Sequence, residues 1–152
     1  MFDSILRRLF PADVLFKATE VYPGLFQGSK ISTDGDVDKI KGLKISTIID
    51  LEGGFDPPMG FLDSYLFWPI LDLPFLPDLQ GLLMVASFGK SVLDHHRKLL
   101  VHCRCGLNRS GLVCARIMAL MGCRGIEILR KINDKVPGAL WNPIFRDYVR
   151  GL

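Results

Sequence analysis

Short apolar runs and longer amphipathic stretches alternate along the chain. Residues 45–51 and 99–102 are almost wholly apolar, and short runs of this kind are typical of buried strands. Residues 65–71 form a similar run, and residues 21–29 read as a short strand broken by turn residues. Polar or turn-rich segments separate these runs, so the pattern predicts a set of short strands.

Helix signals lie between the predicted strands. Thr33 or Asp34 can cap a short helix, and Asp78 stands at the N-cap of a longer one that runs to about residue 96. Residues 110–121 are apolar on nearly all sides, which predicts a helix buried at the centre of the protein. Two further helices are expected near residues 125–133 and 142–150.

Strands that alternate with helices predict a three-layer α/β/α sandwich. Its central sheet should be mostly parallel, with about five strands flanked by helices. Sheets of this kind bind ligands beyond the carboxyl ends of their strands, so we expect the chemistry at the end of the strand 99–102. Residues 52–63 form a loop rich in Gly and Pro that we expect to border this cleft.

Composition and charge exclude several classes of protein. The 152 residues fit one domain, residues 1–152, with 49% apolar and 23% charged residues. A net charge of +3 is too small to indicate nucleic-acid binding, and it does not repel an anionic ligand. No apolar run reaches the roughly 18 residues that span a bilayer. Residues 1–12 are amphipathic and basic, and we expect a short helix packed on the body rather than a membrane-surface anchor.

The cysteines indicate a reducing environment. All four of them lie within 21 residues of one another, whereas a secreted disulfide framework would spread them along the chain. We therefore expect free thiols and a cytoplasmic location. Cys103 and Cys105 lack a second pair of ligands at zinc-site spacing, so no metal is expected.

Residues 102–111, His-Cys-Arg-Cys-Gly-Leu-Asn-Arg-Ser-Gly, join the last strand to the buried helix. A helix N-terminus presents unpaired N–H groups and a positive dipole end, so a tight loop that leads into it can cradle a phosphate. The same field stabilises a thiolate, which makes Cys103 the predicted nucleophile. The planar fork of Arg109 can hold two phosphate oxygens, and Ser110 can donate a hydrogen bond to the sulfur. The predicted cradle consists of Arg104, Cys105, Gly106, Leu107, Asn108 and Arg109.

This stretch resembles the signature H-C-x-x-G-x-x-R-S/T of the protein tyrosine phosphatase superfamily, and the chain is most similar to its small (atypical) dual-specificity branch. The likeness runs from about residue 22 to residue 152, although only residues 102–111 are strongly diagnostic. It implies covalent catalysis through a phosphocysteine intermediate, with no metal and no cofactor.

The resemblance also implies further site residues. Members of the family carry an acid aspartate on a mobile loop before the cysteine, and Asp72, 31 residues before Cys103, is our choice for it. Asp78, 25 residues before the cysteine, is assigned as the helix cap. His102 is expected to shape the loop beside the thiolate. Asn142 matches an asparagine that supports the loop, and it also suits the N-cap of the last helix.

The predicted function is hydrolysis of phosphotyrosine, and of phosphoserine or phosphothreonine, in a phosphorylated protein by a monomeric enzyme. Asn108 leaves a second possibility open, because similar Gly-x-Asn-Arg loops occur in relatives that remove the 5′ phosphate of RNA ends. Phosphoinositide hydrolysis and non-catalytic phosphoprotein binding are further alternatives. The unusual Cys105, or Cys114, can be considered as a redox partner of Cys103.

Overall fold

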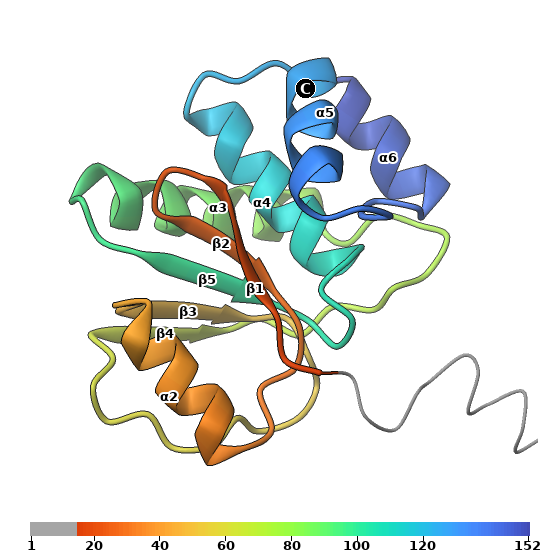
Figure 1. The fold of residues 1–152 in the computed structure, drawn as a ribbon. Helices are drawn as coiled ribbons and strands as arrows, with labels where there is room; N and C mark the ends of the chain where they lie inside the picture. Colours follow the sequence, from red (N-terminus) through yellow and green to blue (C-terminus); the bar gives the residue numbers. More distant parts are fainter. Residues whose placement is uncertain (1–14) are drawn as a thin grey trace, which may run out of the picture.

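A computed structural model describes residues 15–152, which are built around a five-stranded sheet (Figure 1). The strands are β1 (Ala18–Tyr22), β2 (Leu25–Gly28), β3 (Thr47–Asp50), β4 (Ser64–Phe67) and β5 (Leu99–His102). They lie in the order β1-β2-β5-β3-β4. β1 and β2 are antiparallel, and the three other pairings are parallel, so the predicted mostly parallel sheet is confirmed.

Two of the strand predictions need correction. Residues 21–29 do not form one broken strand, because β1 and β2 make a hairpin that turns at Gly24. Gly24 has a φ of +78°, a left-handed conformation that favours glycine. The strand predicted over residues 65–71 ends at Phe67. Pro69 follows shortly afterwards, and a proline has no N–H to donate to a neighbouring strand.

Helices cover both faces of the sheet, which confirms the predicted three-layer sandwich (Figure 1). The helices are α2 (Asp34–Gly42), α3 (Leu79–Asp94), α4 (Arg109–Leu120), α5 (Gly125–Lys135) and α6 (Pro143–Arg150). α2 lies on one face and the other four lie on the opposite face. Thr33 caps α2, and Asp78 caps α3 by accepting a 2.8 Å hydrogen bond from the N–H of Gly81, as predicted.

The hydrophobic core has two parts, one on each side of the sheet. Between the sheet and α2, Ile40 packs in a cluster with Ile48 and Leu100. The larger cluster lies between the sheet and the other four helices, where Leu112 and Ile117 of α4 are fully buried. α4 therefore runs through the centre of this layer, as its apolar sequence predicts.

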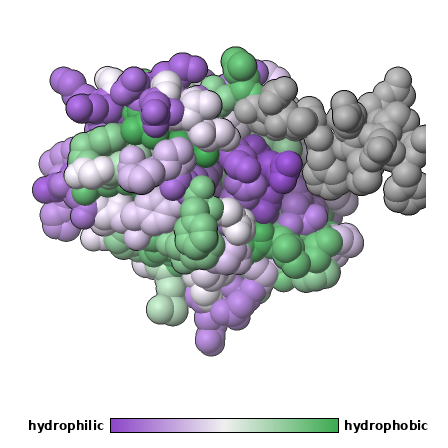
Figure 2. Space-filling view, turned by 90° about the horizontal axis from the view of Figure 1, so that it is seen from below, coloured by the Kyte–Doolittle hydropathy of each residue, from purple (hydrophilic) through white to green (hydrophobic). Residues whose placement is uncertain are grey.

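The outer surface on the α2 side is mixed in character. Figure 2 shows polar side chains with separate apolar patches between them on this face. α2 contributes exposed charged residues there, among them Asp38 and Lys39. No helix in residues 15–152 is long and apolar enough to cross a membrane. The amphipathic helix predicted for residues 1–12 lies outside the described residues.

The strand register brings three strand ends together. In the parallel pairings, Gly28 of β2 and Asp50 of β3 both lie opposite His102 of β5. The chain then passes through residues 103–108 and enters α4. The predicted site therefore lies at the carboxyl edge of the sheet, between β5 and the N-terminus of a buried helix.

Candidate active site

We call residues 103–108 the cysteine loop. Groups outside this loop donate hydrogen bonds to its backbone carbonyls. The Arg104 carbonyl accepts a hydrogen bond from the N–H of Lys30 at 3.1 Å. The Gly106 carbonyl accepts one from the side-chain amide of Gln27 at 2.9 Å, and the Leu107 carbonyl accepts one from the N–H of Leu140 at 3.1 Å. These contacts turn the carbonyls away from the centre of the loop.

The N–H groups at positions 105–108 of the same loop have a different environment from its carbonyls. Within the described part of the chain, the N–H groups of residues 105–108 donate to no other group. They stand at the N-terminus of α4, where the helix dipole adds positive potential. Backbone N–H groups in this arrangement are suited to binding an anion, which is the arrangement that a phosphate cradle needs.

Gly106 is required by the shape of this loop. Its φ is +71°, which side chains other than glycine rarely adopt. A Cβ atom at this position would also lie 2.9 Å from the carbonyl carbon and oxygen of Gly28. The cysteine loop can therefore approach β2 this closely only with glycine here.

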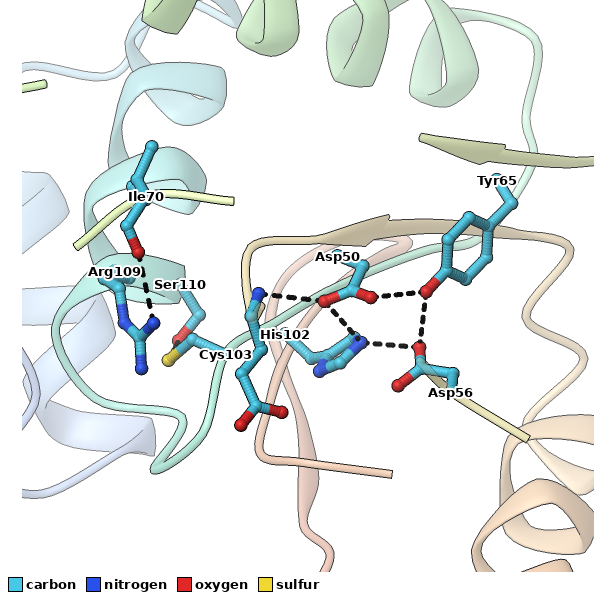
Figure 3. Close-up of polar contacts among 9 residues, drawn as sticks. Asp50, Asp56, Tyr65, Ile70, His102, Cys103, Arg109 and Ser110 are labelled. Atoms are coloured by element: carbon cyan, nitrogen blue, oxygen red, sulfur yellow. Dashed lines mark hydrogen bonds and ion pairs between the residues drawn. The ribbon is translucent and has the colours of Figure 1, made fainter. Parts of the chain in front are cut away.

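Cys103, Arg109 and Ser110 lie together on this loop and the first turn of α4 (Figure 3). The Sγ atom of Cys103 is 3.3 Å from Oγ of Ser110, within hydrogen-bonding distance for a sulfur. The Arg109 guanidinium lies beside the sulfur in Figure 3 and donates a 3.1 Å hydrogen bond to the Ile70 carbonyl. The predicted nucleophile, the predicted phosphate clamp and the predicted hydrogen-bond donor therefore lie close together.

Asp72 is connected to the cysteine loop and to the start of α6 by two asparagines. Its carboxylate accepts hydrogen bonds from the side-chain amides of Asn108, at 2.8 Å, and Asn142, at 2.9 Å. Asn142 also donates to the Leu73 carbonyl and caps α6 through its side-chain oxygen. Both roles expected of Asn142 are therefore compatible with the structure. Asp78 caps α3 and makes no contact of this kind.

His102, the last residue of β5, lies in a group of polar side chains that the sequence motifs do not reveal. Nε2 of His102 is 2.8 Å from Oδ2 of Asp56 and 3.4 Å from Oδ1 of Asp50. The hydroxyl of Tyr65 is 2.5 Å from Asp50 and 2.8 Å from Asp56 (Figure 3). We call these four residues the acid–histidine cluster.

Burial and mutual contacts shift the pKa values in this cluster. Burial raises the pKa of Asp50, and the charge of His102 and the hydrogen bond from Tyr65 offset part of this effect. Burial lowers the pKa of His102, but the hydrogen bond and charge of Asp56 and the charge of Asp50 outweigh it, so the pKa is raised. Burial and the two carboxyls also raise the pKa of Tyr65. All three shifts favour the retention of protons.

Asp50, Asp56 and His102 also have side chains that can ligate metals, with ligand atoms within 4.8 Å of one another. Among these three residues, the contact between His102 and Asp56 is of hydrogen-bond length, at 2.8 Å, whereas His102 and Asp50 are 3.4 Å apart. One sequence signal was available for this cluster. Asp50 is the charged residue that ends an apolar strand, at the edge of the sheet where ligands bind.

The four cysteines are all free thiols. Cys105 is exposed on the cysteine loop, whereas Cys114 is buried inside α4. Burial, and to a smaller extent the neighbouring Cys103, raises the pKa of Cys114 well above its usual value. Cys114 therefore behaves as a packed, unreactive side chain at neutral pH.

The known proteins that are similar in sequence to this chain are dual specificity protein phosphatases. No protein-family profile matches the chain. The chain is 31% identical over 129 residues to dual specificity protein phosphatase 15 of Rattus norvegicus, an alignment that covers 84% of this chain and 54% of that protein. It is 36% identical over 112 residues to dual specificity protein phosphatase 12 of the same organism, covering 71% of this chain and 33% of that protein. The chain thus spans about half or less of the length of these curated relatives.

The fold comparison agrees. The crystal structure of DUSP15 superposes with a TM-score of 0.76 at 28% sequence identity, covering 88% of this chain and 85% of that one. The crystal structure of human DUSP28 superposes equally well, with a TM-score of 0.76, at 21% identity, covering 88% of this chain and 90% of that one. At that identity the second likeness shows the fold alone.

Proposed function

Because this chain belongs to the small dual-specificity branch of the protein tyrosine phosphatase superfamily, we propose that it hydrolyses phosphotyrosine and phosphoserine or phosphothreonine in phosphorylated proteins. The observation that carries the proposal is the cradle around Cys103. The carbonyls of Arg104, Gly106 and Leu107 accept hydrogen bonds from outside the loop, and within the described part of the chain the N–H groups of residues 105–108 donate to no other group at the start of α4. An oxyanion with three equatorial oxygens is the natural partner of such a site.

In the proposed first step, the Cys103 sulfur forms a bond to phosphorus while the bond from phosphorus to the substrate oxygen breaks. Asp72 gives its proton to the departing oxygen and becomes a carboxylate. Arg109 and the N–H groups of residues 105–108 hold the phosphoryl oxygens as charge moves onto them. The product of this step is a phosphocysteine.

In the second step, a water molecule attacks the phosphocysteine. Asp72 takes a proton from the water, and the sulfur–phosphorus bond breaks to release inorganic phosphate. Ser110, 3.3 Å from the sulfur, donates a hydrogen bond that stabilises the departing thiolate. Each group in this scheme comes from one chain, so we propose a monomer that needs no metal and no cofactor. Its four free thiols support a reducing, cytoplasmic setting.

Asn108 prompted the comparison with enzymes that act on RNA ends, and the structure gives its side chain a different use. The amide of Asn108 donates to Asp72, and its oxygen accepts from the N–H of Asn142 at 3.0 Å. The side chain is buried and is directed at the acid loop rather than at a substrate base. This contact supports a reaction that needs an acid, as the release of a tyrosine or serine oxygen does.

The decisive experiment compares turnover of four substrates: a phosphotyrosine peptide, a phosphothreonine peptide, a phosphoinositide and an RNA with a 5′ triphosphate. We expect both peptides to be hydrolysed, and the Cys103→Ser variant to lose turnover of all substrates. Cys123→Ser, a cysteine replacement outside the site, is the matched control and should keep activity. Full turnover by Cys103→Ser would refute the mechanism, and preference for the lipid or the RNA would refute the substrate class.

A further inference from the structure

The acid–histidine cluster contains three consecutive short contacts. Oδ2 of Asp50 is 2.5 Å from the Tyr65 hydroxyl, the hydroxyl is 2.8 Å from Oδ2 of Asp56, and this oxygen is 2.8 Å from Nε2 of His102. Each contact joins two electronegative atoms at hydrogen-bond distance, so each needs one proton between them.

The ordinary protonation states supply only two of these three protons. The Tyr65 hydroxyl provides one and His102 provides one at Nε2, whereas two carboxylates provide none. Protonation of the other imidazole nitrogen does not help, because that atom is outside the three contacts. The third proton must therefore belong to a carboxyl group, as in other pairs of carboxyls that share a site.

Burial favours Asp50 over Asp56 as the carboxyl that holds it, because the Asp56 side chain is the more exposed of the two, at 6%, and lines a surface cavity. The side chain of Asp50 is 1% exposed, and its second oxygen already accepts a 2.9 Å hydrogen bond from the N–H of Glu52. If Oδ2 of Asp50 carries the proton, it donates to the Tyr65 oxygen, and Tyr65 then donates to Asp56. Asp56 remains a carboxylate that accepts from both Tyr65 and His102, so every contact is satisfied.

We propose that Asp50 is a protonated, neutral acid at neutral pH, and that Asp56 alone supplies the negative charge that holds His102 beside Cys103. Asp56 is then a positioning residue for the nucleophile, and it couples the 52–63 loop to the active site. This inference rests on the proposed function for its role, although the protonation itself does not depend on turnover. The raised pKa of Asp50 has the same direction.

Other charged groups near the acid–histidine cluster do not remove the need for a proton on one of its carboxyl groups. On the side of the cysteine loop, Arg104 lies 3.9 Å from Glu52, which pairs these two charges with each other. Cys103 and Arg109 face the phosphate cradle. On the outer side, Tyr65 is 42% exposed and, with Asp56, lines a surface cavity of about 470 Å³. Protons can therefore exchange with solvent through Tyr65.

A matched pair of variants tests the assignment. Asn has the shape and neutral charge of a protonated aspartic acid, so Asp50→Asn should preserve the contacts and the Asp56 carboxylate beside His102. Asp56→Asn removes the one negative charge, whose hydrogen bond and charge raise the pKa of His102, and so weakens the hold of His102 on its proton beside Cys103. The readout is the rate at which iodoacetamide alkylates Cys103 as a function of pH, because the thiolate is the reactive form. Trypsin separates Cys103 from Cys105 by cutting after Arg104, so mass spectrometry resolves the two.

We expect Asp56→Asn to move the midpoint of the alkylation curve upward by about one pH unit, which slows alkylation about tenfold below the midpoint. Asp50→Asn should stay within about twofold of the wild type, as should the control Asp63→Asn, which removes an acid that pairs with Arg97 at the far end of the loop. An equal shift in Asp50→Asn and Asp56→Asn would overturn the proposal.

Infrared spectroscopy gives a test that is independent of catalysis. At neutral pH, the wild type should show the C=O stretch of protonated carboxylic acids. The difference spectrum between wild type and Asp50→Asn should contain this band, whereas the difference spectrum between wild type and Asp63→Asn should not. A wild-type spectrum without this band would overturn the proposal even if a variant failed to fold. The infrared band and the alkylation curves do not depend on phosphatase activity. The proposed function and the proposed protonation of Asp50 can therefore fail separately.

Discussion

The side-chain amide of Asn108 donates a 2.8 Å hydrogen bond to the carboxylate of Asp72, although 36 residues separate them in the chain. The oxygen of the same Asn108 side chain accepts from the N–H of Asn142. One buried amide therefore joins the cysteine loop, the acid loop and the start of α6. The position of the proposed acid is thus tied to the loop that carries the proposed nucleophile.

Removal of this amide should damage the acid step. Asn108→Ala leaves the backbone N–H of the cradle in place but frees Asp72, and a misplacement of about 1 Å can cost about a hundredfold in rate. We expect the largest loss in kcat/KM for substrates with poor leaving groups, such as phenyl phosphate, and a smaller loss for para-nitrophenyl phosphate. Asn133→Ala, on α5, is the control. Equal losses for both leaving groups would contradict a role through Asp72.

Gly106 should tolerate no side chain. Gly106→Ala places a Cβ atom 2.9 Å from the Gly28 carbonyl and forces a left-handed alanine, a strain of about 1–3 kcal/mol. We expect lower stability in urea unfolding and loss of phosphate binding. Gly122→Ala is a matched control, because Gly122 has a φ of +99° and no atom within 4 Å of a Cβ placed there. Retention of activity in Gly106→Ala would show that the loop can move away from β2.

Ser110 should act mainly in the second step. Ser110→Ala removes the hydroxyl that lies 3.3 Å from the Cys103 sulfur, so the thiolate becomes a poorer leaving group. We expect hydrolysis of the phosphocysteine to slow about a hundredfold, while its formation changes little. Rapid-mixing kinetics should then show a burst of product equal to the enzyme concentration. A parallel fall of burst and steady-state rates would place the effect in the first step instead.

The buried Asp50 should make stability depend on pH. Burial raises its pKa above the ordinary value of 3.8, so the folded protein holds this proton more tightly than the unfolded chain does. The stabilisation is complete below the ordinary value and is lost as pH rises through the raised one. A pKa that is higher by one pH unit in the folded protein contributes about 1.4 kcal/mol to the free energy of unfolding.

Asp50→Asn cannot titrate at this position. Wild type should therefore lose stability relative to Asp50→Asn as pH rises from about 4 to about 8, measured by urea unfolding at each pH. His102 acts in the same direction above its ordinary value of 6.5, because its pKa is also raised. Asp63→Asn, with a half-exposed side chain, is the control. Parallel stability curves for wild type and Asp50→Asn would show that Asp50 is not protonated in the folded protein.

Local patterns in the sequence were sufficient for the elements and for the order in which they follow one another. The apolar run 99–102 became β5 with the same bounds, and Asp78 caps α3, because both depend on neighbouring residues in the chain. The spacing of Cys103, Arg109 and Ser110 also predicted their meeting, since all three lie on one turn that leads into one helix. The hairpin of β1 and β2 was missed because a turn and a broken strand have the same composition.

The chain order of residues therefore dictated the cysteine loop, the helix behind it and the free backbone N–H groups between them. Contacts between segments that are distant in the chain could not be predicted from the sequence pattern and were found only in the tertiary structure. The pairing of Asp50 with His102 follows from the parallel register of β3 and β5, and the bond of Asn108 to Asp72 follows from the packing of loop against loop. Proton sharing in a buried cluster depends on which groups meet and how little water reaches them, and neither quantity is encoded in the spacing of residues along the chain.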